Sequence, residues 1–268
     1  MDGFTHSLPD TLQRARQARR VSQLELSLRL GVSQRHVSFV ENGRARPSRD
    51  LLARWLGELD APLALRNAAL LQAGFAPAYR ATSLDDPDLA QAKAALQQLL
   101  KAHDPMPALV LDAHWNLLQL NRGGAWLATT LMAPEALAGS SGSPNLLDML
   151  VHPMGLTRPL FNLREAGPAF LSQLRAEAAL QPALAPKVEA FGALLRDRLD
   201  GRMPPAAHPG PQAPVLTLRF ATPFGELAFF RMFTTFGTPQ DITLASLRVE
   251  HMFAADEATD AVVRAQVR

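Results

Sequence analysis

One short stretch of the chain gathers side chains that can hydrogen-bond to nucleic-acid bases and phosphates. Gln34 can pair with adenine through two hydrogen bonds, and Arg35 can pair in the same way with guanine. Phe39 can contact the methyl group of thymine. Arg44 and Arg46 follow closely and carry the positive charge that suits phosphate oxygens. These residue types at this spacing indicate contacts to double-stranded DNA.

Two short helices are expected to position these side chains, and the first is bounded by local signals. Ser22 can accept a hydrogen bond at the start of a helix that runs to Leu30, and Glu25 lies where the second half of a capping box belongs. Gly31 can adopt the left-handed conformation that ends a helix.

The second helix is expected to run from Gln34 to about Asn42, with Ser33 as its N-cap and Gly43 after its end. Two helices joined by a short turn with glycine are typical of a helix-turn-helix. The predicted inner surface consists of Leu26, Leu30, Val32, Val37 and Val40. The predicted outer face of the second helix consists of Gln34, Arg35, His36, Ser38, Phe39 and Glu41.

The segment SQLELSLRLGVSQRHVSFVENGRARPS resembles the Cro and lambda-repressor (XRE) type of helix-turn-helix. The resemblance implies that the second helix enters the major groove and that residues near both helix ends contact phosphates. The DNA-binding residues are thus expected to be Gln23, Ser33, Gln34, Arg35, His36, Ser38, Phe39, Asn42, Arg44 and Arg46. The alternative is that these polar residues only solvate a small bundle.

The helical pattern extends over residues 8–73 and fits five short helices, of which the last two cover residues 48–59 and 63–73. Residues 1–80 carry 12 arginines and 7 acidic residues, for a net charge of +5, whereas the rest of the chain has a net charge of −3. A basic N-terminal module suits a phosphate-binding partner. We therefore predict a DNA-binding domain in residues 1–80.

Length and composition limit what the rest of the chain can be. A chain of 268 residues, 47% hydrophobic and 19% charged, has room for two globular domains. It has no cysteine, which excludes disulfides and thiolate metal sites. The sequence shows neither a signal peptide nor an apolar run of about 18 residues, so we expect a cytoplasmic protein that does not enter a membrane.

The remaining residues suggest a connector helix, 81–104, and an α+β domain, 105–268. A hairpin is expected in ALVLDAHWNLLQLN, followed by helices at 122–132, 145–151, 164–180 and 186–199 and strand-like runs at 215–221, 226–235 and 243–253. Breaks are expected at 139–143 and 201–214. Two strands, a helical insert and three strands predict a PAS-like domain, with helices on a five-stranded antiparallel sheet.

Three segments of this domain, PALVLDAHWNLLQLN, NLLDMLVHPMGL and TTFGTPQDITLASLRVEHMFAADEAT, resemble the ligand-binding domain of MmyB-like transcription regulators. The resemblance implies a PAS-like fold that binds an apolar small molecule of the fatty-acid type. The sequence departs from the family's pattern at Met106, where an aromatic residue is common, and at Leu163, where a tryptophan is common.

Aromatic and charged residues of this domain are candidates for a ligand site. The apolar candidates are Trp115, Trp126, Phe161, Phe170, Phe230 and Met232, and they can equally be ordinary core. His152 and Arg158 could hold a ligand carboxylate, although a histidine in a turn explains the first equally well. Strand alternation places Phe230 and Met232 on a cleaner apolar face than Phe229 and Arg231.

No nucleophile elbow, P-loop or metal-binding spacing of histidines is present, so we expect neither an enzyme nor a metal site. The leading hypothesis is a transcription regulator whose affinity for DNA depends on an apolar effector. The alternative is a regulator whose second domain serves only dimerisation or protein interaction. A homodimer on a near-palindromic operator is expected in both cases, because one small helix-turn-helix reads few base pairs.

Overall fold

The computed structural model describes residues 7–137, 144–201 and 215–268. The chain forms two compact units, one built mainly on the residues up to Thr82 and the other mainly on the residues after it. Among the described residues, no helix is both long enough and apolar enough to cross a lipid bilayer. The predicted break at 139–143, and all of the predicted loop at 201–214 except Gly201, lie outside the described residues.

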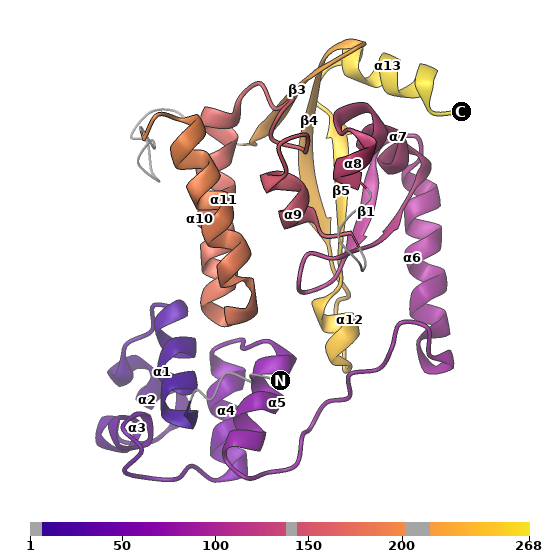
Figure 1. The fold of residues 1–268 in the computed structure, drawn as a ribbon. Helices are drawn as coiled ribbons and strands as arrows, with labels where there is room; N and C mark the ends of the chain where they lie inside the picture. Colours follow the sequence, from indigo (N-terminus) through magenta and orange to yellow (C-terminus); the bar gives the residue numbers. More distant parts are fainter. Residues whose placement is uncertain (1–6, 138–143, 202–214) are drawn as a thin grey trace. The chain divides into compact units, whose positions relative to one another are not determined.

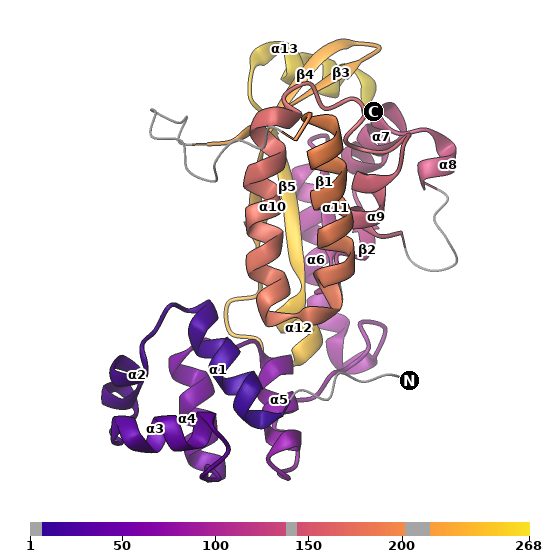
Figure 2. The same ribbon diagram turned by 60° about the vertical axis from the view of Figure 1, so that its left-hand side comes forward.

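Five short helices make up the N-terminal bundle, as predicted (Figures 1 and 2). They are α1 (Leu8–Ala18), α2 (Gln23–Leu30), α3 (Gln34–Glu41), α4 (Arg49–Glu58) and α5 (Leu63–Gln72). Each contributes apolar side chains to one core, in which Leu26, Leu52 and Trp55 have no exposed surface. The bundle is therefore a closed hydrophobic unit around the helix-turn-helix formed by α2 and α3.

The turn between α2 and α3 follows the local signals of the sequence. Ser22 Oγ accepts from the Glu25 backbone N–H at 3.0 Å, and Ser33 Oγ accepts from the His36 N–H at 3.2 Å. Gly31 has φ 67°, the left-handed conformation that ends α2. The expected capping box is incomplete, because the Glu25 carboxylate pairs with Arg29 one turn later.

A five-stranded antiparallel sheet forms the centre of the second unit, also as predicted. Its strands lie in the order β2-β1-β5-β4-β3. Their bounds are Ala108–Leu111 for β1, Leu117–Leu120 for β2, Thr217–Thr222 for β3, Gly225–Thr234 for β4 and Arg248–Ala254 for β5. The last strand in the sequence thus lies between the first hairpin and the last one, which places β5 at the centre of the sheet.

Helices precede, interrupt and follow the strands. They are the short 3-10 helices η1 (Pro87–Leu89) and η2 (Pro182–Leu184), with α6 (Ala90–His103), α7 (Arg122–Leu131), α8 (Pro134–Leu137), α9 (Leu146–Val151), α10 (Leu163–Leu180), α11 (Ala185–Arg198), α12 (Ile242–Ser246) and α13 (Glu257–Gln266). In both ribbon views α10 and α11 run side by side as a helical hairpin beside the sheet (Figures 1 and 2).

Two elements differ from the prediction at the C-terminal end of the chain. The strand expected over 243–253 begins only at Arg248, because Asp241 Oδ1 accepts from the backbone N–H groups of Thr243 and Leu244 and starts α12 instead. The final helix α13 was not expected from the sequence. It begins after Asp256, whose side chain accepts from the Thr259 N–H at 2.7 Å.

Candidate functional site

The outward face of α3 carries the side chains predicted to read DNA. Gln34 and Arg35 are exposed at its N-terminal end, whereas His36, Ser38 and Phe39 are half-buried. The Arg35 guanidinium carbon lies 5.1 Å from the centre of the Phe39 ring, one turn further along the helix. This cation–π contact holds the arginine over the helix surface while leaving it accessible to a partner.

Glu41 does not belong to this outward face, contrary to the prediction. Its carboxylate is buried and accepts two hydrogen bonds from Arg16 of α1, each 2.7 Å long. Gln23 of α2 donates to the same carboxylate at 2.8 Å. The hydrogen bond with Glu41 raises the pKa of Arg16 above its usual value. The carboxylate thereby joins three helices and fixes the orientation of α3.

The remaining predicted DNA-binding residues flank α3. Asn42 donates through Nδ2 to the Ser38 carbonyl at 2.8 Å, while Arg44 and Arg46 are exposed in the loop that follows. Ser33 is exposed at the N-cap of α3. The structure therefore brings the ten predicted residues to the two ends and the outer side of one helix, with Gln23 held by Glu41. Their contacts with DNA remain a prediction.

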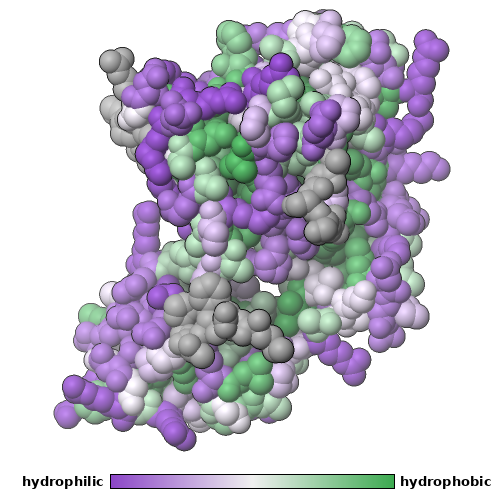
Figure 3. All heavy atoms as spheres, in the orientation of Figure 1, coloured by the Kyte–Doolittle hydropathy of each residue, from purple (hydrophilic) through white to green (hydrophobic). Residues whose placement is uncertain are grey.

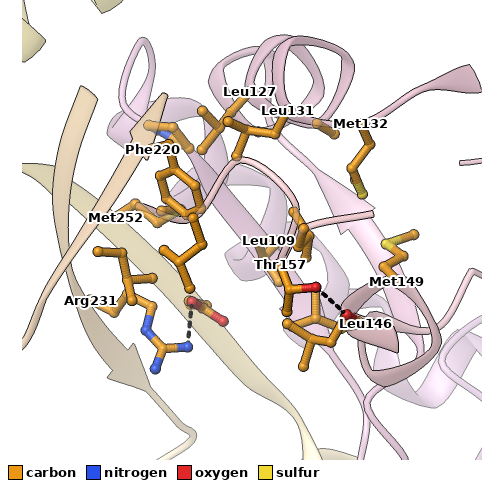
Figure 4. A pocket seen from close by; sticks show the side chains of 18 of the residues that line it. Leu109, Leu127, Leu131, Met132, Leu146, Met149, Thr157, Phe220, Arg231 and Met252 are labelled. Carbon is orange, nitrogen blue, oxygen red and sulfur yellow. Dashed lines mark hydrogen bonds and ion pairs between the residues drawn. The ribbon is translucent and has the colours of Figure 1, made fainter. Parts of the chain in front are cut away.

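The second unit contains a cavity of about 300 Å³ between its sheet and the helices on one side (Figure 4). Of the described residues that line it, all but three are apolar, and most of these are leucines and methionines. Leu127 and Leu131 come from α7, Met149 from α9 and Met252 from β5. Such a lining suits an apolar molecule and offers water few hydrogen bonds.

Thr157, Arg231 and Glu250 are the polar residues of the lining. The Thr157 hydroxyl is occupied, because it donates to the Leu150 carbonyl at 2.8 Å. Arg231 Nη1 donates to Glu250 Oε1 at 3.2 Å, as the dashed line from Arg231 in Figure 4 marks. The Arg231 and Glu250 side chains are only 15% and 5% exposed, so this ion pair forms a buried polar end to an apolar space.

A buried amide holds α7, which forms one wall of the cavity, against the sheet. Asn121 accepts from the backbone N–H groups of Ala108 and Gly124, both at 2.8 Å, and donates to the Met106 carbonyl at 2.7 Å. A Cβ atom on Gly124 would overlap the Ala108 carbonyl, so only glycine permits this approach. Asn121 and Gly124 were not identified from the sequence, although Asn is a preferred N-cap residue and Asn121 stands directly before α7.

Of the eight predicted ligand-binding residues, Phe170 lines the cavity. Trp115 is fully buried beneath the Arg248 guanidinium, whose carbon lies 3.7 Å from its ring centre. Trp126 packs against Phe224 at 5.9 Å between ring centres. Both tryptophans lie outside the residues that line the cavity.

The other five predicted residues also lie outside the cavity lining. His152 accepts from the Met154 N–H at 3.1 Å, in the turn that the alternative interpretation proposed. Arg158 and Phe161 are exposed. Met232 is 55% exposed, and Phe230 stacks on Phe253 with ring centres 5.3 Å apart.

The cavity therefore faces the side of β4 that strand alternation predicted to be the less apolar one. Arg231 lies on that side and Met252 pairs with it in the register of β4 and β5. Leu163, which departs from the family pattern, lies in the lining too. The aliphatic lining was not predicted from the sequence. A usable signal was Arg231, a charged residue on the same face of β4 as the fully buried Phe229, because a charge in that position indicates a polar site inside the fold.

Polar residues cover most of the face in Figure 3, with hydrophobic residues in smaller patches. The described residues include no group of three or more His, Asp or Glu side chains that could hold a metal ion.

A helix-turn-helix bundle and an α+β domain with an apolar cavity define a DNA-binding transcription regulator with a ligand-binding domain. Residues 12–65 match the family model for a helix-turn-helix, and residues 92–265 match the model for the MmyB-like transcription regulator ligand binding domain. The chain belongs to the MmyB-like transcription regulators, a non-enzymatic family. A comparison with curated proteins found no match.

Proposed function

We propose that α3 reads operator DNA in the major groove through Gln34, Arg35 and His36, with Phe39 against a thymine methyl group. The exposure of Gln34 and Arg35 at the N-terminal end of the helix supports this assignment, because that end reaches the bases in helix-turn-helix proteins. Arg44 and Arg46 contact phosphates on the same side. A homodimer places two such helices in half-sites about 34 Å apart.

Arg35→Ala is expected to weaken discrimination at one base position by about 1 to 3 kcal/mol, because the guanidinium can donate two hydrogen bonds to one guanine. Binding of random-sequence DNA should fall much less. Competitive binding to an operator selected from a random library, and to all single-base variants of it, measures the difference.

Arg44→Ala is the matched control for this experiment, since it removes the same charge from the same surface. It should weaken binding to every sequence alike. The slope of log affinity against log salt concentration should fall by about one, because one phosphate contact is lost. Equal losses on operator and random DNA for Arg35→Ala would show that this arginine contacts phosphates and that α3 is placed wrongly.

We further propose that the cavity of the second domain binds an apolar small molecule, with a fatty acid as the first candidate, and that binding changes affinity for DNA. The observation that carries this proposal is an apolar cavity of about 300 Å³ whose described lining includes one charged pair, at one end. A ligand of this kind can act only if it binds the two conformations of the protein with different affinity.

We place this regulator in the cytoplasm.

The second candidate function is dimerisation or protein interaction without an effector. Phe230 and Met232 favour it, because they lie outside the cavity and Met232 is more than half exposed on a strand of the sheet.

Native mass spectrometry of the purified full chain, before and after mild denaturation, separates the two candidates. Organic extraction then identifies whatever is released. A dimer that releases an apolar molecule supports the effector proposal. A dimer that carries nothing, and that still binds no fatty acid when fatty acids are added, supports the candidate without an effector.

A further inference from the structure

The polar end of the cavity contains a carboxylate oxygen without a partner. Glu250 Oε1 accepts from Arg231, but Oε2 is fully buried and has no hydrogen-bond partner among the described residues. The Glu250 side chain is 5% exposed, so bulk water does not compensate for the missing bond. A buried carboxylate oxygen without a donor is costly and is rare in folded proteins. Glu250 is one of the residues that line the cavity, so a ligand bound there is the nearest source of the missing donor.

The charges around this oxygen limit the head group that fits. Arg231 already neutralises Glu250, and its guanidinium lies over the Phe170 ring, 4.8 Å from the centre. A ligand carboxylate would bring a second negative charge beside Glu250, and a ligand ammonium would bring a second positive charge beside Arg231. A charged head group would also lose its hydration in an otherwise apolar cavity. An uncharged donor avoids all three costs.

We propose that this cavity selects an amphipathic ligand with an uncharged hydrogen-bond donor as its head group, such as a primary alcohol or a primary amide. The donor binds Glu250 Oε2, and the alkyl chain fills the leucine and methionine lining. A fatty acid fits the same site in its neutral form, as a donor of its O–H. The inference rests on the proposed binding of an apolar effector and specifies the chemistry of its head.

Four probes with one alkyl chain test this selection: decanol, decanamide, decanoate and methyl decanoate. Their affinities for delipidated full-length protein are measured by isothermal titration calorimetry at neutral pH. Decanol and decanamide should bind about tenfold tighter than methyl decanoate, which has no donor, because a hydrogen bond to a charged group is worth that much or more. They should also bind tighter than decanoate, because its negative charge would lie beside Glu250. This comparison needs no variant and does not depend on the folding of one.

Glu250→Gln then tests the residue itself. The carboxamide can donate a hydrogen bond, so the preference for decanol over methyl decanoate should disappear and decanoate should gain about tenfold. Glu226→Gln is the matched control, since it removes an exposed carboxylate that pairs with Arg219 on the same sheet, outside the cavity lining. It should leave all four affinities unchanged.

The outcomes separate the inference from the proposed function. If all four probes bind equally, or if decanoate binds tightest, the head-group inference is overturned while the apolar site stands. If none of the four binds the delipidated protein, the proposed effector site itself is overturned.

Discussion

Arg16→Met is expected to lower the free energy of unfolding of the N-terminal bundle by about 3 to 5 kcal/mol. The substitution leaves the Glu41 carboxylate buried without its charged partner, and a single hydrogen bond from Gln23 compensates only in part. Because Glu41 fixes α3, the variant should also lose operator binding. Hydrogen–deuterium exchange of peptides from α1 to α5 in the full chain measures the local stability.

The double variant Arg16→Met with Glu41→Leu distinguishes a lost ion pair from a lost packing contact. A buried ion pair replaced on both sides by apolar residues is often neutral, so the double variant should recover most of the stability. If packing of the aliphatic part of Arg16 contributed most to the free energy of unfolding, the double variant would not recover that stability. A single variant as stable as the wild-type protein would contradict the proposed role of Glu41.

Leu131→Trp is expected to reduce affinity for an apolar ligand about 100-fold. The larger side chain occupies space in the cavity and displaces about four ligand methylene groups, each worth about 0.8 kcal/mol on burial, for a loss of about 3 kcal/mol. The ligand-free protein should stay folded, because the added atoms enter a void and do not overpack a filled core. Titration with decanol, together with thermal unfolding, measures both effects.

Thr129→Trp is the matched control on the same helix. Thr129 is exposed and does not line the cavity, so the same tryptophan there should leave ligand affinity unchanged. If Leu131→Trp binds decanol as well as the wild-type protein does, the cavity is not the binding site.

The helix-turn-helix could be predicted because its signals are local. Ser22, Gly31 and Ser33 determine where two helices begin and end through bonds to neighbouring backbone groups. Glu41 could not be assigned in this way, because its partner Arg16 lies 25 residues earlier in the chain. A polar residue on a helix is expected to face solvent unless a distant residue of opposite charge is known to meet it.

The antiparallel sheet was also predictable, since alternation and turn residues mark its strands. The strand-like run was expected to begin at Thr243, but the side chain of Asp241 starts a helix there, so β5 begins only at Arg248. The helix α13 had a usable signal in Asp256, an N-cap residue followed by Glu257.

The ligand site was the least predictable part of the fold. Aromatic residues were expected to line it, but Trp115 fills the core and Phe161 is 70% exposed. A cavity is a space left where helices and sheet do not meet, so it depends on the packing of many aliphatic residues whose sequence pattern is that of ordinary core. Only the paired charges of Arg231 and Glu250, the second of them in the buried centre of β5, distinguish it.

Coupling between ligand binding and DNA binding is tested most directly by measuring operator affinity in the presence and absence of ligand. The full-length protein is delipidated, and its dissociation constant for a selected operator is measured with and without saturating decanol. Leu131→Trp is measured in parallel. We expect this dissociation constant to change about 5- to 150-fold for the wild-type protein and to stay the same for the variant. The same dissociation constant in both states of the wild-type protein, with decanol shown to be bound, would contradict this coupling.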